Sequence, residues 1–184
     1  DPRALDSSAL VKSELNRLAG LVGDFLAFAR PSDLRVDNAD ISQLCATLGR
    51  LLASDAESAN VELTTKIEAG VVARVDAEKL KQVLINLLRN AIEATGKDGN
   101  VCLDCHRIGQ SVYLEIKDDG PGIPEGIDIF EPFATSKEAG TGLGLPIVHR
   151  IVTDHDGSID YRREDAKTVF TVELPIDGPH AESL

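Results

Sequence analysis

The spacing of the apolar residues changes several times along this chain, and these changes constrain its fold more than any other feature. At about residues 41–59 and 76–95, apolar side chains recur every three or four positions, which predicts two amphipathic helices. The segments "NVCLDCHRI" and "SVYLEIKD" flank a Gly-Gln turn and predict a β-hairpin over residues 101–118. A third helix is expected at about 142–155, after a loop rich in Gly and Pro over 119–141. The other predicted strands are "VELTTKIE", "VVARVD", "GSIDYRR" and "KTVFTVELP".

These elements predict an α+β fold, a two-layer α/β sandwich in which helices cover one face of a mixed, mostly antiparallel sheet. Asp76 is a good N-cap for the second helix. We expect this domain to occupy residues 36–176 and to be followed by a frayed tail at 177–184.

A long helix is predicted ahead of this domain, at about residues 3–30. Its apolar residues are spaced four and three apart, as in a heptad seam. They are Val11, Leu15, Leu18, Val22, Phe25 and Ala29. Such a face must pack on other helices, either within the same domain or in a bundle with a partner chain or a missing segment. We favour one long N-terminal bundle helix with a linker, together residues 1–35, because "ARPSDL" breaks the helix as a linker would.

The charge of the chain limits its partners. The formal net charge is -12 and the pI about 4.7, a surface that repels nucleic acid and anionic membranes, so no nucleic acid partner is expected. No apolar run reaches the length of a membrane span and no signal peptide is visible. The chain contains no Met, and we therefore expect it to be a piece of a longer protein.

The three cysteines, Cys45, Cys102 and Cys105, are an odd and sparse set. This argues against a disulfide framework and favours a reducing compartment. The segment "CLDCH" matches the C-x-x-C-H pattern of haem attachment. We favour a plain strand instead, because residues three apart in a strand point to opposite faces and could not hold one ligand.

Glycines alternate with other residues in "GTGLGL", residues 140–145, directly before the third predicted helix. A helix N-terminus presents free N–H groups and a positive dipole end, so an anion is the most plausible ligand there. The pattern is neither the G-x-G-x-x-G of dinucleotide folds nor a P-loop.

A polar ridge accompanies the apolar face of the helix that follows Asp76. Asn86, Asn90 and Glu93 are spaced four and three apart and share one side of the helix. Amide oxygens are hard ligands suited to Mg²⁺, which commonly bridges protein to phosphate oxygens. The alternative is an exposed polar stripe without a role.

Two further segments carry candidate ligand contacts. In "DDGPGIP", residues 118–124, a carboxylate at a strand end precedes Gly120 and Gly122, so it could accept a hydrogen bond from an exocyclic amine such as that of adenine. The alternative is an ordinary Asp-Gly turn. In "FEPFATSKEAG", Lys137 could contact terminal phosphates as a point charge, or it is a solvated loop lysine.

Taken in order, "NLLRNAIEA", "DDGPGIP", "IFEPFATSK" and "GTGLGLPIV" resemble the N, G1, F and G2 boxes of the sensor histidine kinase ATP-binding domain. That domain belongs to the family shared with gyrase, Hsp90 and MutL. The resemblance covers roughly residues 36–176. Upstream, "LNRLAGLVGDFLAFARPSDL" resembles the second helix of the dimerisation and phosphotransfer domain with its linker.

The resemblance implies a MgATP site. Asn90 would bind Mg²⁺ with support from Asn86, Asp118 would accept from the adenine amino group, and Lys137 would hold phosphates; Asn86, Asn90 and Lys137 are the implied catalytic residues. Phe130 and Phe133 would anchor a lid over 123–139 that closes around nucleotide. The implied nucleotide-binding residues are Asn86, Asn90, Asp118, Gly120, Gly122, Ile123, Phe130, Phe133, Lys137, Gly140, Thr141, Gly142, Leu143, Gly144, Leu145 and Thr168.

The resemblance also implies transfer of the ATP γ-phosphoryl group to a His on a protein, for relay to an Asp of a response regulator receiver domain. The gyrase and Hsp90 branch has a Glu at the position of Asn86 as general base for water, and Asn cannot replace it. This residue and the N-terminal helix argue against an ATPase or a serine-directed kinase of the same superfamily. A nucleotide-binding pseudokinase or scaffold is the alternative that stays open.

The chain departs from the family in several places. It has no H-E-x-x-N-P motif, and its four histidines, His106, His149, His155 and His180, lie elsewhere, with His149 and His155 expected to be structural or surface residues. The phospho-acceptor would therefore lie on a helix of the same or a partner kinase, and the fragment is not expected to autophosphorylate alone.

The start of the lid is about two residues shorter than expected, and "HDG" replaces H-G-G. A homodimer through the N-terminal helix and a cytoplasmic location, within a membrane-anchored sensor, are further expectations.

Overall fold

The structure is a computed structural model that describes residues 23, 34–124, 126–134 and 142–179. Apart from Gly23, which is helical, the N-terminal helix predicted over residues 3–30 lies outside the described residues. The elements are β1 (Asp37–Asp40), α2 (Ile41–Ser58), β2 (Glu62–Ile67), β3 (Val72–Val75), α3 (Ala77–Thr95), β4 (Asn100–Ile108), β5 (Ser111–Asp118), α4 (Gly144–Asp154), β6 (Ser158–Glu164) and β7 (Lys167–Pro175).

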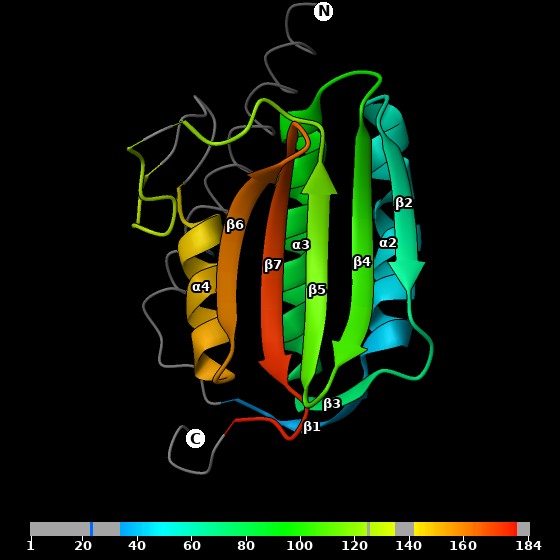
Figure 1. The fold of residues 1–184 in the computed structure, drawn as a ribbon, viewed down its shortest axis with the longest axis vertical. Helices are drawn as coiled ribbons and strands as arrows, with labels where there is room; N and C mark the ends of the chain where they lie inside the picture. The colour runs from blue at the N-terminus through cyan, green and yellow to red at the C-terminus, as the bar shows by residue number, and fades with distance from the viewer. Residues whose placement is uncertain (1–22, 24–33, 125, 135–141, 180–184) are drawn as a thin grey trace, which may run out of the picture.

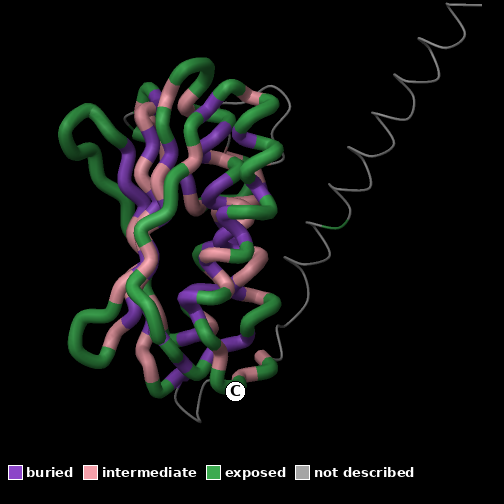
Figure 2. The backbone as a smooth tube through the Cα atoms, turned by 90° about the vertical axis from the view of Figure 1, so that its right-hand side faces the viewer, coloured by how far each residue is buried: buried purple, intermediate pink, exposed green. Residues whose placement is uncertain are grey.

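The described residues form two layers. The main sheet has five strands in the order β2-β4-β5-β7-β6, with β2 and β4 parallel and the other neighbours antiparallel. Helices α2, α3 and α4 all lie on one face of this sheet (Figure 1). Figure 2 shows the layers edge-on, with buried residues on the sides that face each other. The predicted α+β sandwich with a mixed, mostly antiparallel sheet is confirmed.

The helices begin where the sequence predicts because of their caps. The Asp40 side chain accepts from the Gln43 amide of α2 at 2.8 Å, and Asp76 accepts from the Glu78 and Lys79 amides of α3 at 3.1 Å. Both helices then bury one apolar face against the sheet. The buried residues of α3 are Leu80, Val83, Leu84, Leu87, Leu88, Ala91 and Ile92.

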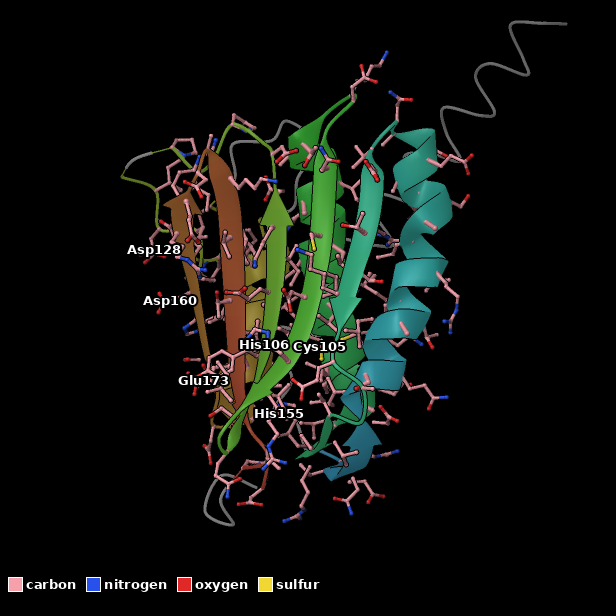
Figure 3. The ribbon with its side chains drawn as sticks, turned by 45° about the vertical axis from the view of Figure 1, so that its right-hand side comes forward. Cys105, His106, Asp128, His155, Asp160 and Glu173 are labelled. Atoms are coloured by element: carbon pink, nitrogen blue, oxygen red, sulfur yellow. The ribbon has the colours of Figure 1, made fainter. Side chains whose placement is uncertain are left out.

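His155, at the end of α4, supports the same cap. It is buried, its Nε2 accepts the Asp76 amide proton at 3.0 Å, and its Nδ1 lies 2.7 Å from the Ile151 carbonyl oxygen. Nδ1 therefore carries the proton. Figure 3 shows His155 toward the end of the molecule where β1 and β3 lie. Its role is structural, as we predicted.

The hairpin of β4 and β5 pairs from Val101 with Asp118 to Ile108 with Ser111. Alternate residues face the helices, so Cys105 is buried while Cys102 is half-buried on the opposite face. The two thiols of "CLDCH" therefore point to opposite sides of the sheet, which confirms the plain strand. A hydrogen bond with Cys105, and burial, raise the pKa of the buried Cys45 thiol of α2.

Two features differ from the predictions. The strand β1 was not predicted, and it pairs antiparallel with β3 in a separate two-stranded sheet. The prediction that the tail frays from Asp177 is wrong at its start: Gly178 and Pro179 are buried, and the Arg74 amide of β3 donates to the Ile176 carbonyl at 2.8 Å. A Cβ on Gly178 would lie 2.6 Å from the Arg74 carbonyl oxygen, so this contact requires glycine. Among the described residues, no helix is long and apolar enough to cross a membrane.

Candidate nucleotide site

The candidate site begins where β5 ends, at Asp118. Its side chain is only 3% exposed, and Oδ1 accepts the Gly120 amide proton at 2.9 Å. Thr168 of β7 lies directly opposite Asp118 in the register of the two strands. Burial raises the pKa of Asp118, while the Gly120 amide, the Thr168 hydroxyl and the charge of Arg163 oppose the shift. A buried acceptor is thus held in a fixed orientation at a strand end.

The glycines after Asp118 allow a close approach of backbone segments. A Cβ on Gly120 would lie 2.6 Å from Asp118 Oδ1 and 3.0 Å from the backbone of Ala94, near the end of α3. Gly122 has a positive φ of 89°, which favours glycine. The loop is therefore pressed against both the carboxylate and α3, so the Asp-Gly segment is more than an exposed turn.

The middle of α3, at Asn86, faces the glycine run. A Cβ on Gly144 would lie 3.8 Å from Asn86 Oδ1, so the first turn of α4 and the amide side chain are neighbours. Leu143, the N-cap residue of α4, has no side-chain acceptor for the helix amides. Of the first three helical positions only Pro146 lacks an N–H, so the N–H groups of Gly144 and Leu145 begin the helix without a side-chain cap. An anion would be stabilised there.

Helix α3 joins these two groups. Ala94 contacts the Asp118 end and Asn86 contacts the Gly144 end, a separation of eight residues or about 12 Å along the helix axis. Asn90 lies between them and is half-buried, whereas Glu93 is exposed. The arrangement therefore offers an acceptor for a base at one end and donors for an anion at the other.

Two aromatic residues of the loop before α4 are placed differently. Phe130 packs against His149 of α4 and Tyr161 of β6, with ring centroids 5.1 and 6.5 Å apart. Phe133 is 64% exposed and donates its amide proton to the Gly142 carbonyl at 2.9 Å. The Phe130 side chain therefore packs on α4 and β6, whereas the Phe133 side chain is exposed and the backbone of Phe133 contacts the glycine segment.

The remaining predicted site residues are distributed as follows. Ile123 is partly buried and packs against the core, Leu143 is buried, and Leu145 is half-buried. Gly142 lies against Phe133, where a Cβ would be 2.6 Å from the Phe133 Cα. Lys137, Gly140 and Thr141 lie outside the described residues.

Sequence reasoning missed Arg163 and Lys167, which flank the turn between β6 and β7. Arg163 Nη1 donates to the Gly120 carbonyl at 2.8 Å and to Thr168 Oγ1 at 3.0 Å. Lys167 Nζ lies 3.1 Å from Asp119 Oδ1. No local pattern marks these residues, because their contacts depend on how β6 and β7 pair with β5.

The fold is an α/β sandwich that carries a candidate nucleotide site where β5 and α4 meet α3. The family model described as "Histidine kinase-, DNA gyrase B-, and HSP90-like ATPase" matches residues 75–178. The match covers more than half of the chain, and the chain therefore belongs to this ATPase family.

Curated relatives are sensor kinases. The chain is 33% identical over 180 residues to sporulation kinase C of Bacillus subtilis. The aligned region covers 95% of this chain and 42% of the relative. The chain is 34% identical over 172 residues to sensor histidine kinase ZraS of Escherichia coli, which covers 91% of this chain and 37% of the relative. The chain thus spans well under half the length of these relatives.

Solved structures of histidine kinases share the fold. The catalytic domain of ThkA matches with a TM-score of 0.73 and 32% identity over 78% of this chain and 97% of that domain. Full-length ShkA in complex with AMPPNP matches with a TM-score of 0.81 and 28% identity, over 96% of this chain and 39% of ShkA. ThkA in complex with the response regulator TrrA matches with a TM-score of 0.78 and 29% identity, over 91% of this chain and 49% of that chain.

Proposed function

We propose that this chain is the ATP-binding catalytic core of a two-component sensor histidine kinase, which transfers the ATP γ-phosphoryl group to a His on a separate helix. The observation that carries the proposal is that α3 lies beside two candidate ligand contacts. Near its end it is next to the loop that follows the buried acceptor Asp118, and at Asn86 it is next to the first turn of α4, where Leu143 provides no side-chain cap. The family membership and the kinase relatives support it.

The adenine base would lie at Asp118, whose carboxylate accepts from the exocyclic amine, with Gly120, Gly122 and Thr168 shaping the pocket. The phosphates would lie at the first turn of α4, where backbone N–H groups of the glycine segment and Lys137 neutralise their charge. Phosphoryl transfer depends mainly on positioning and charge neutralisation, which these groups supply.

Asn90, with Asn86 on the same ridge, would hold Mg²⁺ together with phosphate oxygens. Among the described residues, no group of three or more His, Cys, Asp or Glu side chains could hold a metal ion. An amide oxygen fits an ion that keeps several waters and binds mainly to nucleotide phosphates. When bound, the ion would neutralise charge on the phosphates. Since Asn86 cannot deprotonate water, transfer to a side chain is favoured over hydrolysis.

The partners follow from this function. A His on a phospho-acceptor helix of the same or a partner kinase would receive the phosphoryl group, and a response regulator Asp would receive it next. The complex of ThkA with TrrA supports a response regulator as partner. We place the domain in the cytoplasm, where ATP and response regulators are found, and we infer a homodimer through the N-terminal helix.

The first test is calorimetric titration of ATP with Mg²⁺ into the wild-type chain, Asn90→Ala and Asp118→Ala. Saturable binding to the wild type that both substitutions abolish is the expected result. A second test supplies a helix with the acceptor His in trans and measures phospho-His. Binding without transfer would favour a pseudokinase, and no binding to a folded wild-type chain would overturn the proposal.

A further inference from the structure

Arg163 links three strands at the base-binding end of the site. It belongs to β6, the edge strand, and pairs in register with Thr168 of the neighbouring β7. Beyond β7 lies β5, and the Arg163 side chain reaches the Gly120 carbonyl just after its end. Figure 1 shows these three strands side by side, with the ends of β6 and β5 next to the start of β7.

The contacts of Arg163 determine how Thr168 is oriented. A guanidinium only donates hydrogen bonds, so Thr168 Oγ1 is the acceptor in its 3.0 Å contact with Arg163 Nη1. The hydroxyl proton of Thr168 therefore points away from Arg163, and Asp118 lies directly opposite Thr168 in the neighbouring strand β5. Arg163 thus orients the hydroxyl group that faces the Asp118 carboxylate.

The same nitrogen holds the loop that carries the second contact to Asp118. Nη1 lies 2.8 Å from the Gly120 carbonyl oxygen, and the Gly120 amide donates to Asp118 Oδ1 at 2.9 Å. A Cβ on Gly122 would lie 3.2 Å from Nη1, so the guanidinium also packs closely against this glycine. One side chain therefore positions both the Gly120 loop, whose amide donates to Asp118, and the Thr168 hydroxyl opposite that carboxylate.

We propose that Arg163 is a positioning residue for base recognition, which orients the Asp118 carboxylate through Thr168 and Gly120 without itself contacting the base. The inference rests on the proposed function, because it requires that Asp118 accepts a hydrogen bond from the amine of adenine. Its particular consequence is selectivity: Arg163 increases affinity for a nucleotide with an exocyclic amine and has little effect on one that lacks it.

The neighbouring Arg162 provides a matched control. It is also an arginine of β6, but it points to the opposite face of the sheet, where Nη2 lies 3.1 Å from Glu115 Oε1 and Nη1 donates to Thr171. Arg163→Gln and Arg162→Gln remove the same charge from the same strand. A difference between the two variants therefore reports the contacts of Arg163 rather than a change in net charge.

The experiment measures the affinities of the chain for MgATP and MgITP by calorimetry. ITP has a carbonyl in place of the exocyclic amine and the same ribose and phosphates. We expect Arg163→Gln to bind ATP roughly tenfold more weakly, as for loss of a hydrogen bond to a charged group, while its ITP affinity stays near the wild-type value. Arg162→Gln should leave both affinities unchanged.

A second variant protects the test against misfolding of the first. Thr168→Val removes the hydroxyl that contacts Arg163 and faces Asp118, and it keeps Arg163. It should also lower the ratio of ATP affinity to ITP affinity. In the double variant, the loss in free energy of ATP binding should be smaller than the sum of the losses in the two single variants, because both residues act through Asp118. Thermal unfolding of each variant checks that it is folded.

The outcomes separate the inference from the proposed function. If the wild type binds ATP and prefers it to ITP, but Arg163→Gln and Thr168→Val keep this preference, only the inference is wrong. Equal losses of ATP and ITP affinity would also overturn it, since Arg163 would then act on the ribose or the phosphates. If the wild type does not bind ATP, the proposed function fails and the inference fails with it.

Discussion

At the scale of single residues, function at this site opposes stability. Asp118 is buried, and burial raises the pKa of its carboxyl despite three favourable contacts. An acid with a raised pKa in the folded state stabilises the fold most below its unfolded pKa, and this contribution is lost as the pH rises through the folded pKa. Ionisation of this buried carboxyl therefore costs folding free energy, and the proposed role as an acceptor for the base would require that cost.

We predict that Asp118→Asn abolishes ATP binding while leaving the free energy of unfolding at neutral pH equal to or above that of the wild type. The advantage of the variant should grow as the pH rises from the ordinary value of 3.8 for this group. Urea unfolding at several pH values, with calorimetry for ATP, would measure both effects. A variant that is less stable at neutral pH than the wild type would contradict the prediction.

At the scale of elements, α3 matters most because it joins the two halves of the site. Its N-cap, Asp76, also receives the incoming chain: Oδ2 accepts the Arg35 amide proton at 2.9 Å, while Oδ1 caps the Glu78 and Lys79 amides. The buried His155 accepts the amide proton of Asp76 itself. The last residue of the predicted linker, Arg35, is therefore attached directly to the helix that carries Asn86 and Asn90.

We predict that Asp76→Ala costs about 2 kcal/mol of stability, near the upper end for loss of an N-cap. The matched control is Asp40→Ala, which removes the N-cap of α2. Asp40 is exposed and accepts from the single amide of Gln43, so its loss should cost about 1 kcal/mol or less. Chemical unfolding of both variants measures the difference, and equal losses would show that the contact with Arg35 adds nothing.

The two phenylalanine side chains in the described part of the loop before α4 differ in burial. Phe130 lies between His149 and Tyr161, whereas Phe133 is 64% exposed. We predict that Phe130→Ala costs about 2 kcal/mol of stability and that Phe133→Ala leaves stability within about 0.5 kcal/mol of the wild type. Thermal unfolding would measure both, and a larger loss for Phe133→Ala would be the contrary result.

At the scale of the whole molecule, the two faces of the sheet have different tasks. The helices and the candidate site lie on one side, and the opposite face carries a network of charges across several strands. At its centre, Glu115 contacts Lys117 Nζ at 2.8 Å and Arg162 Nη2 at 3.1 Å. Burial alone would raise the pKa of Glu115, but Lys117 and Arg162 outweigh it and lower the pKa. This face contributes to stability and lies away from the site.

We predict that Glu115→Gln lowers stability by about 1 kcal/mol at neutral pH and leaves ATP affinity unchanged. A carboxyl with a lowered pKa contributes stability above its unfolded pKa, and this contribution is lost as the pH falls through the folded pKa. The difference from the wild type should therefore disappear in acid. Urea unfolding at neutral and acidic pH is the measurement, and a penalty that persists in acid would point to packing instead.

The sequence by itself determined the types of the elements and the order of the motifs. Asp40 and Asp76 cap helices through amides two or three residues away, and the hairpin of β4 and β5 follows from alternating residues around a short turn. Such signals depend on neighbours within a few positions, so they can be read from the chain alone. The candidate residues Asn86, Asp118, Gly120 and Gly144 lie in short motifs of the sequence, and the family resemblance of these motifs implied their roles, which stay predictions.

Only the tertiary structure decided which distant segments meet. The pairing of β1 with β3, the packing of Gly178 on Arg74 and the reach of Arg163 to Gly120 join residues far apart in the chain. Asp118 faces Thr168 because β5 and β7 pair in one register, and a slip by one residue would turn that side chain to the other face. Register and close backbone approach depend on the packing of the whole core, and no local pattern records them.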